Sequence, residues 1–172
     1  YRPDFALNCS PPLFVKALSQ YPLSLQTEPG HYQSAREDQI LFTKPLPIVG
    51  EIQLAQIFSD LSTWIPKDAI ITNGAGNFAT WVHRFYRYGG FRTQLAPVNG
   101  SMGYGLPAAI AAKMTYPNRC VICVAGDGDF MMNSQELATA MRYGIKIIVL
   151  ILNNGMFGTI RMHQEREYKS RI

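Results

Sequence analysis

Two apolar runs with one helix-length segment between them constrain the fold of this chain more than any other feature. The first run is Cys-Val-Ile-Cys-Val-Ala at residues 120–125, and the second is Ile-Lys-Ile-Ile-Val-Leu-Ile-Leu at residues 145–152. Short apolar runs separated by a helix are typical of buried parallel strands in a βαβ unit. Neighbouring parallel strands end at the same edge of the sheet, about 4.8 Å apart.

Polar residues that can bind a metal follow both runs. Gly126-Asp127-Gly128 comes directly after the first, and Asn153-Asn154 comes directly after the second. We therefore expect the Asp127 carboxylate and the Asn154 carboxamide to meet beyond the strand ends, where open α/β sheets bind ligands. These oxygen donors suit Mg²⁺ or Ca²⁺ better than zinc or copper, and two side chains suffice for a metal that carries a phosphorylated ligand. The alternative is that both segments are tight turns without a ligand.

The rest of the chain favours an α/β fold, with a parallel sheet flanked by helices. Asn133 followed by Glu136 resembles a capping box, and Gly144 fits the position after a helix end. Further strands are expected near residues 69–72 and 92–95, and helices near residues 13–20, 50–64, 77–88, 104–115, 133–143 and 156–167.

Composition narrows the classes of function. The 172 residues are 47% hydrophobic, which suits one domain of ordinary size, and no apolar run reaches the 18 residues that a membrane-spanning helix needs. The formal charge of +4 is mild. Basic and aromatic residues alternate near residues 83–92, which we interpret as an amphipathic helix with packed rings and solvated arginines rather than a nucleic-acid surface. We therefore expect neither a membrane nor a nucleic-acid partner.

The three cysteines are predicted to be free thiols without disulfide bonds. Cys120 and Cys123 imitate a redox motif, but positions three apart on a strand face opposite sides, so a disulfide between them is implausible. We interpret both as small buried apolar residues. Together with Cys9, they fit a cytoplasmic protein with free thiols.

Four segments, in order, resemble the signature of thiamine-diphosphate enzymes in their diphosphate-binding domain. The resemblance covers residues 47–168 and is closest to the acetolactate synthase-like branch, which includes decarboxylases and carboligases of 2-oxo acids. It implies the thiamine-diphosphate-binding fold for residues 47–172, with the C-terminal end of the domain missing, and makes residues 1–46 the tail of a preceding domain and a linker. The four segments are residues 72–81, 99–109, 126–140 and 152–158.

The resemblance also implies roles for individual residues. Asp127, Asn154 and the backbone carbonyl of Met156 correspond to the Mg²⁺ ligands. Met102 corresponds to the residue that holds the cofactor in a V shape, and the Gly100 carbonyl to the acceptor of its 4′-amino group, which makes these two the catalytic candidates. The remaining cofactor-binding positions lie near the diphosphate: Ala75, Gly76, Asn77, Phe78, Gly128 and Asp129.

One position departs from the family pattern. Family members often carry a hydroxyl or a small residue where this chain has Asp129. A carboxylate beside a diphosphate is repelled, so we expect the Asp129 side chain to turn outward or to bond backbone amides near the helix start. Further along, His163, Gln164 and Glu165 correspond to a region that covers the active site, although a solvated helix face explains them equally well.

The implied function is decarboxylation of a 2-oxo acid followed by carboligation, a transferase or lyase activity that uses thiamine diphosphate and Mg²⁺. The family's activating glutamate belongs to a pyrimidine-binding domain, usually of a neighbouring subunit. No position here matches it, so we expect this chain to be inactive alone and to work in a homodimer or tetramer. FAD would bind only through a domain absent here. The alternatives are a simple decarboxylase, a non-catalytic cofactor-binding or assembly module, and a Rossmann-like nucleotide binder, which the lack of a well-placed Gly-x-Gly-x-x-Gly disfavours.

Overall fold

The computed structural model describes residues 2–22 and 28–171, and the chain divides into two compact units, residues 1–39 and 40–172. The first unit contains helix α1 (Pro11–Leu18) and most of helix α2 (His31–Phe42), neither of which has a buried residue. Helix α1 was predicted. Helix α2 was not, because its sequence lacks the apolar stripe that marks an amphipathic helix. The domain boundary between residues 46 and 47 stays a prediction.

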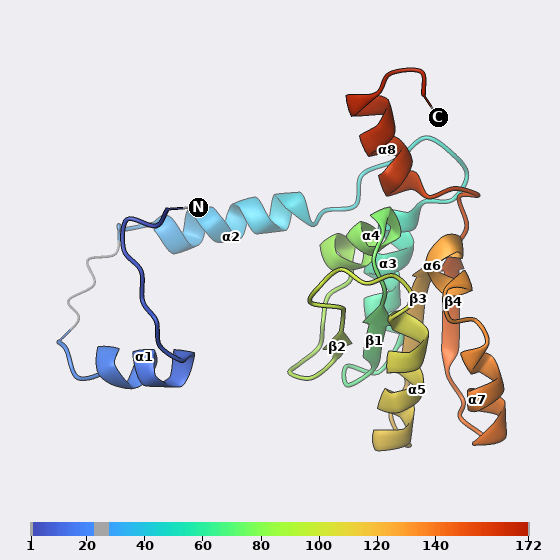
Figure 1. Ribbon diagram of the computed structural model, residues 1–172, viewed down its shortest axis with the longest axis horizontal. Helices are drawn as coiled ribbons and strands as arrows, with labels where there is room; N and C mark the ends of the chain where they lie inside the picture. Colours follow the sequence, from blue (N-terminus) through green and yellow to red (C-terminus); the bar gives the residue numbers. More distant parts are fainter. Residues whose placement is uncertain (1, 23–27, 172) are drawn as a thin grey trace. The chain divides into compact units, whose positions relative to one another are not determined.

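The second unit is built on a four-stranded parallel sheet with the strand order β2-β1-β3-β4 (Figure 1). This confirms the predicted α/β class and the parallel pairing of the two apolar runs. In chain order the strands are β1 (Ile70–Asn73), β2 (Gln94–Leu95), β3 (Val121–Gly126) and β4 (Ile148–Leu152).

Helices cover both faces of the sheet. Because side chains alternate along a strand, β3 contributes apolar residues to a buried cluster on each face. Cys123 and its neighbours at every second position of β3 pack in one buried cluster with residues of α5 and α7, whereas Ile122 and Val124 pack in another with residues of α3 and α4. The six helices of this unit are α3 (Leu54–Trp64), α4 (Asn77–Phe85), α5 (Gly105–Thr115), α6 (Asp127–Met131), α7 (Glu136–Arg142) and α8 (Gly158–Glu167).

Strand β4 differs from the prediction of a fully buried strand over residues 145–152. It begins at Ile148 and forms one edge of the sheet, so its side chains are only partly covered. Ile145 and Ile147 precede the strand but still pack against the core cluster under α5. The apolar run is thus continuous in sequence but covers three residues of irregular structure, 145–147, as well as the strand.

The segment after Gly126 also folds differently. One helix over residues 133–143 is predicted, with a tight turn at Gly126-Asp127-Gly128 only as the alternative, whereas α6 begins at Asp127 itself and α7 begins only at Glu136. The predicted capping box is wrong, because the Asn133 side chain donates to the Gly103 carbonyl at 2.9 Å instead. Gly144 does follow the helix end as predicted, with a φ of +60°.

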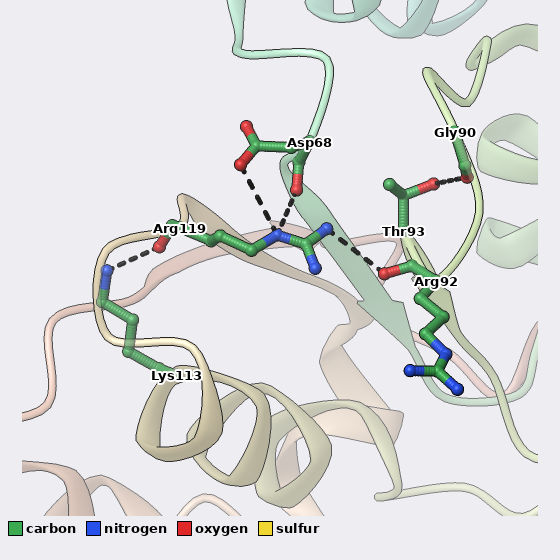
Figure 2. Close-up of polar contacts among 6 residues, drawn as sticks. All are labelled: Asp68, Gly90, Arg92, Thr93, Lys113 and Arg119. Carbon is green, nitrogen blue, oxygen red and sulfur yellow. Dashed lines mark hydrogen bonds and ion pairs between the residues drawn. The ribbon is translucent and has the colours of Figure 1, made fainter.

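Arg119 bonds to the segments at the end of the sheet where the strands begin, opposite the strand ends that carry Asp127 and Asn154 (Figure 2). Its guanidinium donates to the Asp68 carbonyl at 2.6 Å, approaches the Asp68 carboxylate at 3.7 Å, and donates to the Arg92 carbonyl at 3.2 Å. The Lys113 ammonium donates to the Arg119 carbonyl at 2.6 Å. These contacts join the segments before β1, β2 and β3 far from the strand ends that carry the motifs.

The basic and aromatic cluster after Asn77 packs as expected. Helix α4 ends at Phe85, which is buried together with Tyr86, and the Trp81 and Phe85 rings stack at 5.8 Å. Arg84 is not simply solvated, because its guanidinium lies 4.1 Å from the Phe42 ring and donates to the Phe42 carbonyl at 2.7 Å.

All three cysteines are free, as predicted. Cys123 is fully buried and Cys120 half-buried, while Cys9 is exposed. Burial raises the pKa of the Cys123 thiol to about 11, so it stays protonated at neutral pH. Among the described residues, no helix is long and apolar enough to cross a membrane.

Candidate functional site

A pocket of about 230 Å³ lies beyond the ends of β3 and β4. Every site residue predicted from the motifs lines it, so the fold brings together segments that are far apart in sequence. Four segments form its walls: the start of α4, the loop before α5, the start of α6, and the loop between β4 and α8. The lining residues are Ala75, Gly76, Asn77, Phe78, Gly100, Met102, Gly126, Asp127, Gly128, Asp129, Leu152, Asn154, Met156, Phe157, Gly158, Thr159 and Ile160.

The two strand ends place the predicted metal ligands side by side. Gly126 at the end of β3 pairs with Leu152 at the end of β4, so Asp127 and Asn154 follow neighbouring positions in the sheet. Asp127 is half-buried at the first residue of α6. Figure 1 shows α6 and α8 at this same end of the sheet.

A tight turn organises the other two predicted oxygen donors. The Asn154 Oδ1 accepts the Met156 N–H at 3.2 Å, and the Met156 carbonyl accepts the Gly158 N–H at 3.0 Å. The turn is closed by Gly155, whose φ of +64° favours glycine. Each oxygen keeps a second lone pair, so both remain able to bind a cation.

These donors fit a magnesium ion that arrives with a phosphorylated ligand. One carboxylate, one carboxamide and one carbonyl are hard oxygen ligands, and Mg²⁺ takes its remaining positions from water and phosphate. Within residues 2–22 and 28–171, no group of three or more His, Cys, Asp or Glu side chains gathers to hold a metal.

Two aromatic rings lie against the Gly-Asp-Gly backbone. A Cβ on Gly126 would lie 2.8 Å from the Phe78 ring, and a Cβ on Gly128 would lie 2.6 Å from the Phe157 ring. Both positions therefore need glycine unless a ring moves. Phe157 was missed as a site residue, although its place directly after Met156 in the segment 152–158 was the available signal.

Asp129 turns inward, so of the two expected arrangements the outward one is not found, and the side chain bonds backbone amides instead. Its side chain is only 2% exposed, and its Oδ1 accepts the Gly103 N–H at 2.8 Å and the Ala75 N–H at 3.3 Å. The expected bonding to backbone amides is found, but the amides belong to two other pocket loops. Burial raises the pKa of the Asp129 carboxyl, and the two N–H bonds oppose that rise.

The loop before α5 presents the two catalytic candidates. Gly100 is exposed with a φ of +72° and open space around its Cα, while Met102 is half-buried in the pocket wall. The Asn99 side chain accepts the Ser101 hydroxyl at 2.6 Å and the Ser101 N–H at 3.2 Å, which shapes the tip of the loop.

Helix α8 contacts the pocket only at its start. The Thr159 hydroxyl donates to the Asn77 Oδ1 at 2.7 Å, which joins α8 to the start of α4. His163, Gln164 and Glu165 lie further along this exposed helix and do not line the pocket. The Glu165 carboxylate pairs with Arg161 at 2.9 Å, as expected of a solvated helix face.

The chain is similar to known proteins of one family. The family profile described as thiamine pyrophosphate enzyme, C-terminal TPP binding domain, matches residues 74–172. An acetolactate synthase from Arthrospira platensis is 43% identical over 104 residues, and an acetolactate synthase large subunit from Lactococcus lactis subsp. lactis is 44% identical over 105 residues. Each alignment covers 60% of this chain and 18% of the relative, so the chain spans about a fifth of the length of these curated relatives.

A solved structure shows the same fold. The Rhodococcus jostii RHA1 thiamine diphosphate-dependent 4-hydroxybenzoylformate decarboxylase superposes with a TM-score of 0.63 at 28% sequence identity. The superposition covers 75% of this chain and 26% of that one.

Proposed function

Because the chain belongs to the thiamine pyrophosphate enzymes and carries their C-terminal cofactor-binding domain, we propose that the pocket beyond β3 and β4 holds the diphosphate of thiamine diphosphate together with one Mg²⁺. The observation that carries this proposal is the convergence of the site residues predicted from the motifs on one pocket at two adjacent parallel strand ends. The pocket lining contains oxygen atoms that can bind a cation, and it contains Gly126 and Gly128, which have no side chain to keep a ligand away from the backbone.

The metal would be held by the Asp127 carboxylate, the Asn154 carboxamide oxygen and the Met156 carbonyl. The two side chains and the carbonyl leave room for diphosphate oxygens in an octahedral shell. Because Asp127 carries the only formal charge in this set, it contributes most of the attraction for the cation, and the cation in turn offsets the charge of the diphosphate.

Backbone N–H groups would bind the diphosphate directly. Gly128 and Asp129 lie in the first turn of α6, where N–H groups have no partner within the helix. Asn77 and Phe78 occupy the corresponding first turn of α4, after Gly76 with its φ of +153°. Both helix starts line the same pocket, so their free N–H groups support one anionic ligand from two sides.

The loop before α5 would support the middle of the cofactor. Met102 offers a bulky apolar side chain in the pocket wall, and the exposed Gly100 leaves its carbonyl free to accept the cofactor's 4′-amino group. When bound, thiamine diphosphate supplies a nucleophilic carbon that attacks the carbonyl of a substrate. The residues of this chain bind the cofactor, orient it and keep its diphosphate neutralised.

The whole protein's activity is proposed from the relatives. We propose an acetolactate synthase-like reaction, in which a 2-oxo acid is decarboxylated and joined to a second carbonyl compound. A pyrimidine-binding domain, from another subunit of a homodimer or tetramer, would supply the activating glutamate. FAD binding and a cytoplasmic location stay predictions, as does the inactivity of this chain without that domain.

A binding titration tests the site. Thiamine diphosphate is titrated into the protein with and without Mg²⁺, and then into the Asp127→Ala variant. Loss of a direct metal ligand should weaken the Mg²⁺-dependent affinity by about 100-fold or more, since even residues behind the ligands matter by about 10- to 100-fold. Glu51→Ala removes an exposed carboxylate elsewhere and should change nothing. Unaltered affinity in Asp127→Ala would overturn the proposal.

Product analysis tests the reaction. With pyruvate as substrate, the protein together with its pyrimidine-binding domain should release CO₂ and form acetolactate. Release of acetaldehyde without acetolactate would identify the protein as a simple decarboxylase and not a carboligase. The absence of both products would favour a non-catalytic binding module.

A further inference from the structure

We propose that Asp129 and Asn133 are positioning residues, which fix Gly103 and thereby set Met102 against the loop that carries Asp127. The inference rests on the proposed function, because the positioning serves thiamine diphosphate. Neither side chain was assigned this role by the sequence motifs. The two residues lie four positions apart, about one helical turn, on α6 and the turn that follows it.

Gly103 is held at both of its polar backbone groups. Its N–H donates to the Asp129 Oδ1 at 2.8 Å, and its carbonyl accepts the Asn133 Nδ2 at 2.9 Å. Its φ of +81° and the lack of space reinforce the contact, since a Cβ there would lie 2.7 Å from the Asn133 Nδ2 and from the Met132 Cβ. The loop before α5 is therefore docked on α6 through a single buried residue.

The Asp129 carboxylate joins a third segment to the same point. Its Oδ1 also accepts the Ala75 N–H at 3.3 Å, so the loop after β1, the loop before α5 and the start of α6 meet at one buried oxygen. A buried polar oxygen is costly without hydrogen-bond donors, so separating these three segments would leave the Asp129 Oδ1 without the two N–H groups that it accepts.

This junction lies between the two ends of the proposed cofactor site. Met102 directly precedes Gly103 and faces the pocket, whereas Asp127 lies two residues before Asp129 on the metal side. The junction thus sets the spacing between the support for the cofactor's middle and the ligand for its diphosphate. With 2% exposure, the Asp129 side chain acts through Gly103. Displacements of about 1 Å at such positions can cost about 100-fold in function.

The test compares Asp129→Asn with Asp129→Ala. Both variants remove the charge, but only asparagine keeps an oxygen that can accept the Gly103 N–H. In the intact protein, affinities are measured for thiamine diphosphate and for inorganic pyrophosphate, each with Mg²⁺. Relative to Asp129→Asn, Asp129→Ala should bind thiamine diphosphate about tenfold more weakly, whereas its loss of pyrophosphate affinity should be smaller, because only the longer bond to the Ala75 N–H, at 3.3 Å, reaches the diphosphate side. Equal losses for the two ligands, or no loss, would overturn the inference.

A second pair of variants tests the hydrogen bond from the Asn133 side chain to the Gly103 carbonyl. Asn133→Ala removes the donor to the Gly103 carbonyl, and Ser134→Ala, next to it, serves as the control. Asn133→Ala should show the same selective loss of thiamine diphosphate, and Ser134→Ala should not. This pair decides the matter if Asp129→Ala fails to fold.

Amide hydrogen exchange in the cofactor-free protein separates the two proposals. The Gly103 N–H should exchange slowly in the wild type and in Asp129→Asn, and about tenfold faster or more in Asp129→Ala. Equal exchange in the two variants would overturn the positioning role. A wild type that shows this exchange pattern but binds no thiamine diphosphate would instead refute the proposed function, and with it the purpose of the junction.

Discussion

Replacing Gly74 by alanine should destabilise the second unit through Asp129. A Cβ at residue 74 would lie 1.9 Å from the Asp129 Oδ1 and 2.5 Å from its Oδ2 and Cγ. Contacts this short cannot exist, and the carboxylate is too enclosed to swing into water. It would have to leave the N–H groups of Gly103 and Ala75.

The size of the effect follows from those bonds. A hydrogen bond to a charged group contributes about 1.5–3 kcal/mol, and the bond at 2.8 Å is stronger than the one at 3.3 Å. We expect Gly74→Ala to lower the free energy of unfolding by about 3 kcal/mol. At about 2–4 °C per kcal/mol for a domain near this size, the melting temperature should fall by about 6–12 °C.

Calorimetry or thermal denaturation measures the change, with Gly90→Ala as the matched control. Gly90 is exposed, has no atom within 4 Å of an added Cβ and does not need the left-handed region, so its replacement should be neutral or slightly stabilising. The double variant with Asp129→Ala should be no less stable than Asp129→Ala alone, because the clash has gone. A melting temperature for Gly74→Ala that equals the control's would show that the added Cβ does not displace the Asp129 carboxylate.

Three further outcomes follow from other parts of the fold. Because burial raises the pKa of Cys123 to about 11, dithionitrobenzoate at pH 8 should label the exposed Cys9 in the native protein and Cys123 only after denaturation; equal rates would contradict its burial. Arg119→Ala should cost about 1–3 kcal/mol of stability in urea denaturation and leave Mg²⁺–thiamine diphosphate affinity unchanged, since its bonds lie at the far edge of the sheet. The Tyr88 hydroxyl is buried without a hydrogen-bond partner among the described residues, so Tyr88→Phe should raise stability at pH 7 by about 1 kcal/mol. Burial also raises the pKa of Tyr88 above its usual value, so the folded state resists ionisation of this phenol more than the unfolded state does. The free energy of unfolding should therefore be independent of Tyr88 ionisation below about pH 10 and should fall as the pH rises further. Measuring unfolding against pH should show a smaller fall in Tyr88→Phe.

The positions of the main chain elements could be predicted because apolar runs and glycines mark them. The run at residues 120–125 became β3 within one residue, and the parallel pairing of β3 with β4 followed from the single helical crossover. These two facts alone placed Asp127 and Asn154 at one edge. The motif residues then converged on one pocket as the family resemblance implied.

Local structure that depends on distant contacts could not be predicted. Helix α6 contains Gly128, and glycine disfavours helices, so the sequence does not predict a helix that begins at Asp127. In the structure the Asp129 side chain bonds this segment to two other loops. Asn133 has the spacing of a capping residue but bonds Gly103, 30 positions away. Sequence spacing reports neighbours along the chain and is silent about such partners.

The exposure of β4 illustrates a second limit. Its composition is as apolar as that of β3, yet Ile148 and Ile151 are 49% and 46% exposed, because the strand lies at the sheet edge. Hydrophobicity indicates a strand but not its place in the strand order. The place of Phe157 directly after Met156 was a signal in the sequence, but the contact of its ring with Gly128 depends on the fold of the loop.

Metal titration decides whether one metal ion depends on both strand ends and on the diphosphate. Mn²⁺ replaces Mg²⁺, and electron paramagnetic resonance follows the free ion in the presence and absence of thiamine diphosphate. Mn²⁺ should bind tightly only when the cofactor is present, and this binding should be lost in both Asp127→Asn and Asn154→Leu. Binding that is equally tight without the cofactor, or that survives either substitution, would contradict a metal shared by Asp127, Asn154 and a diphosphate.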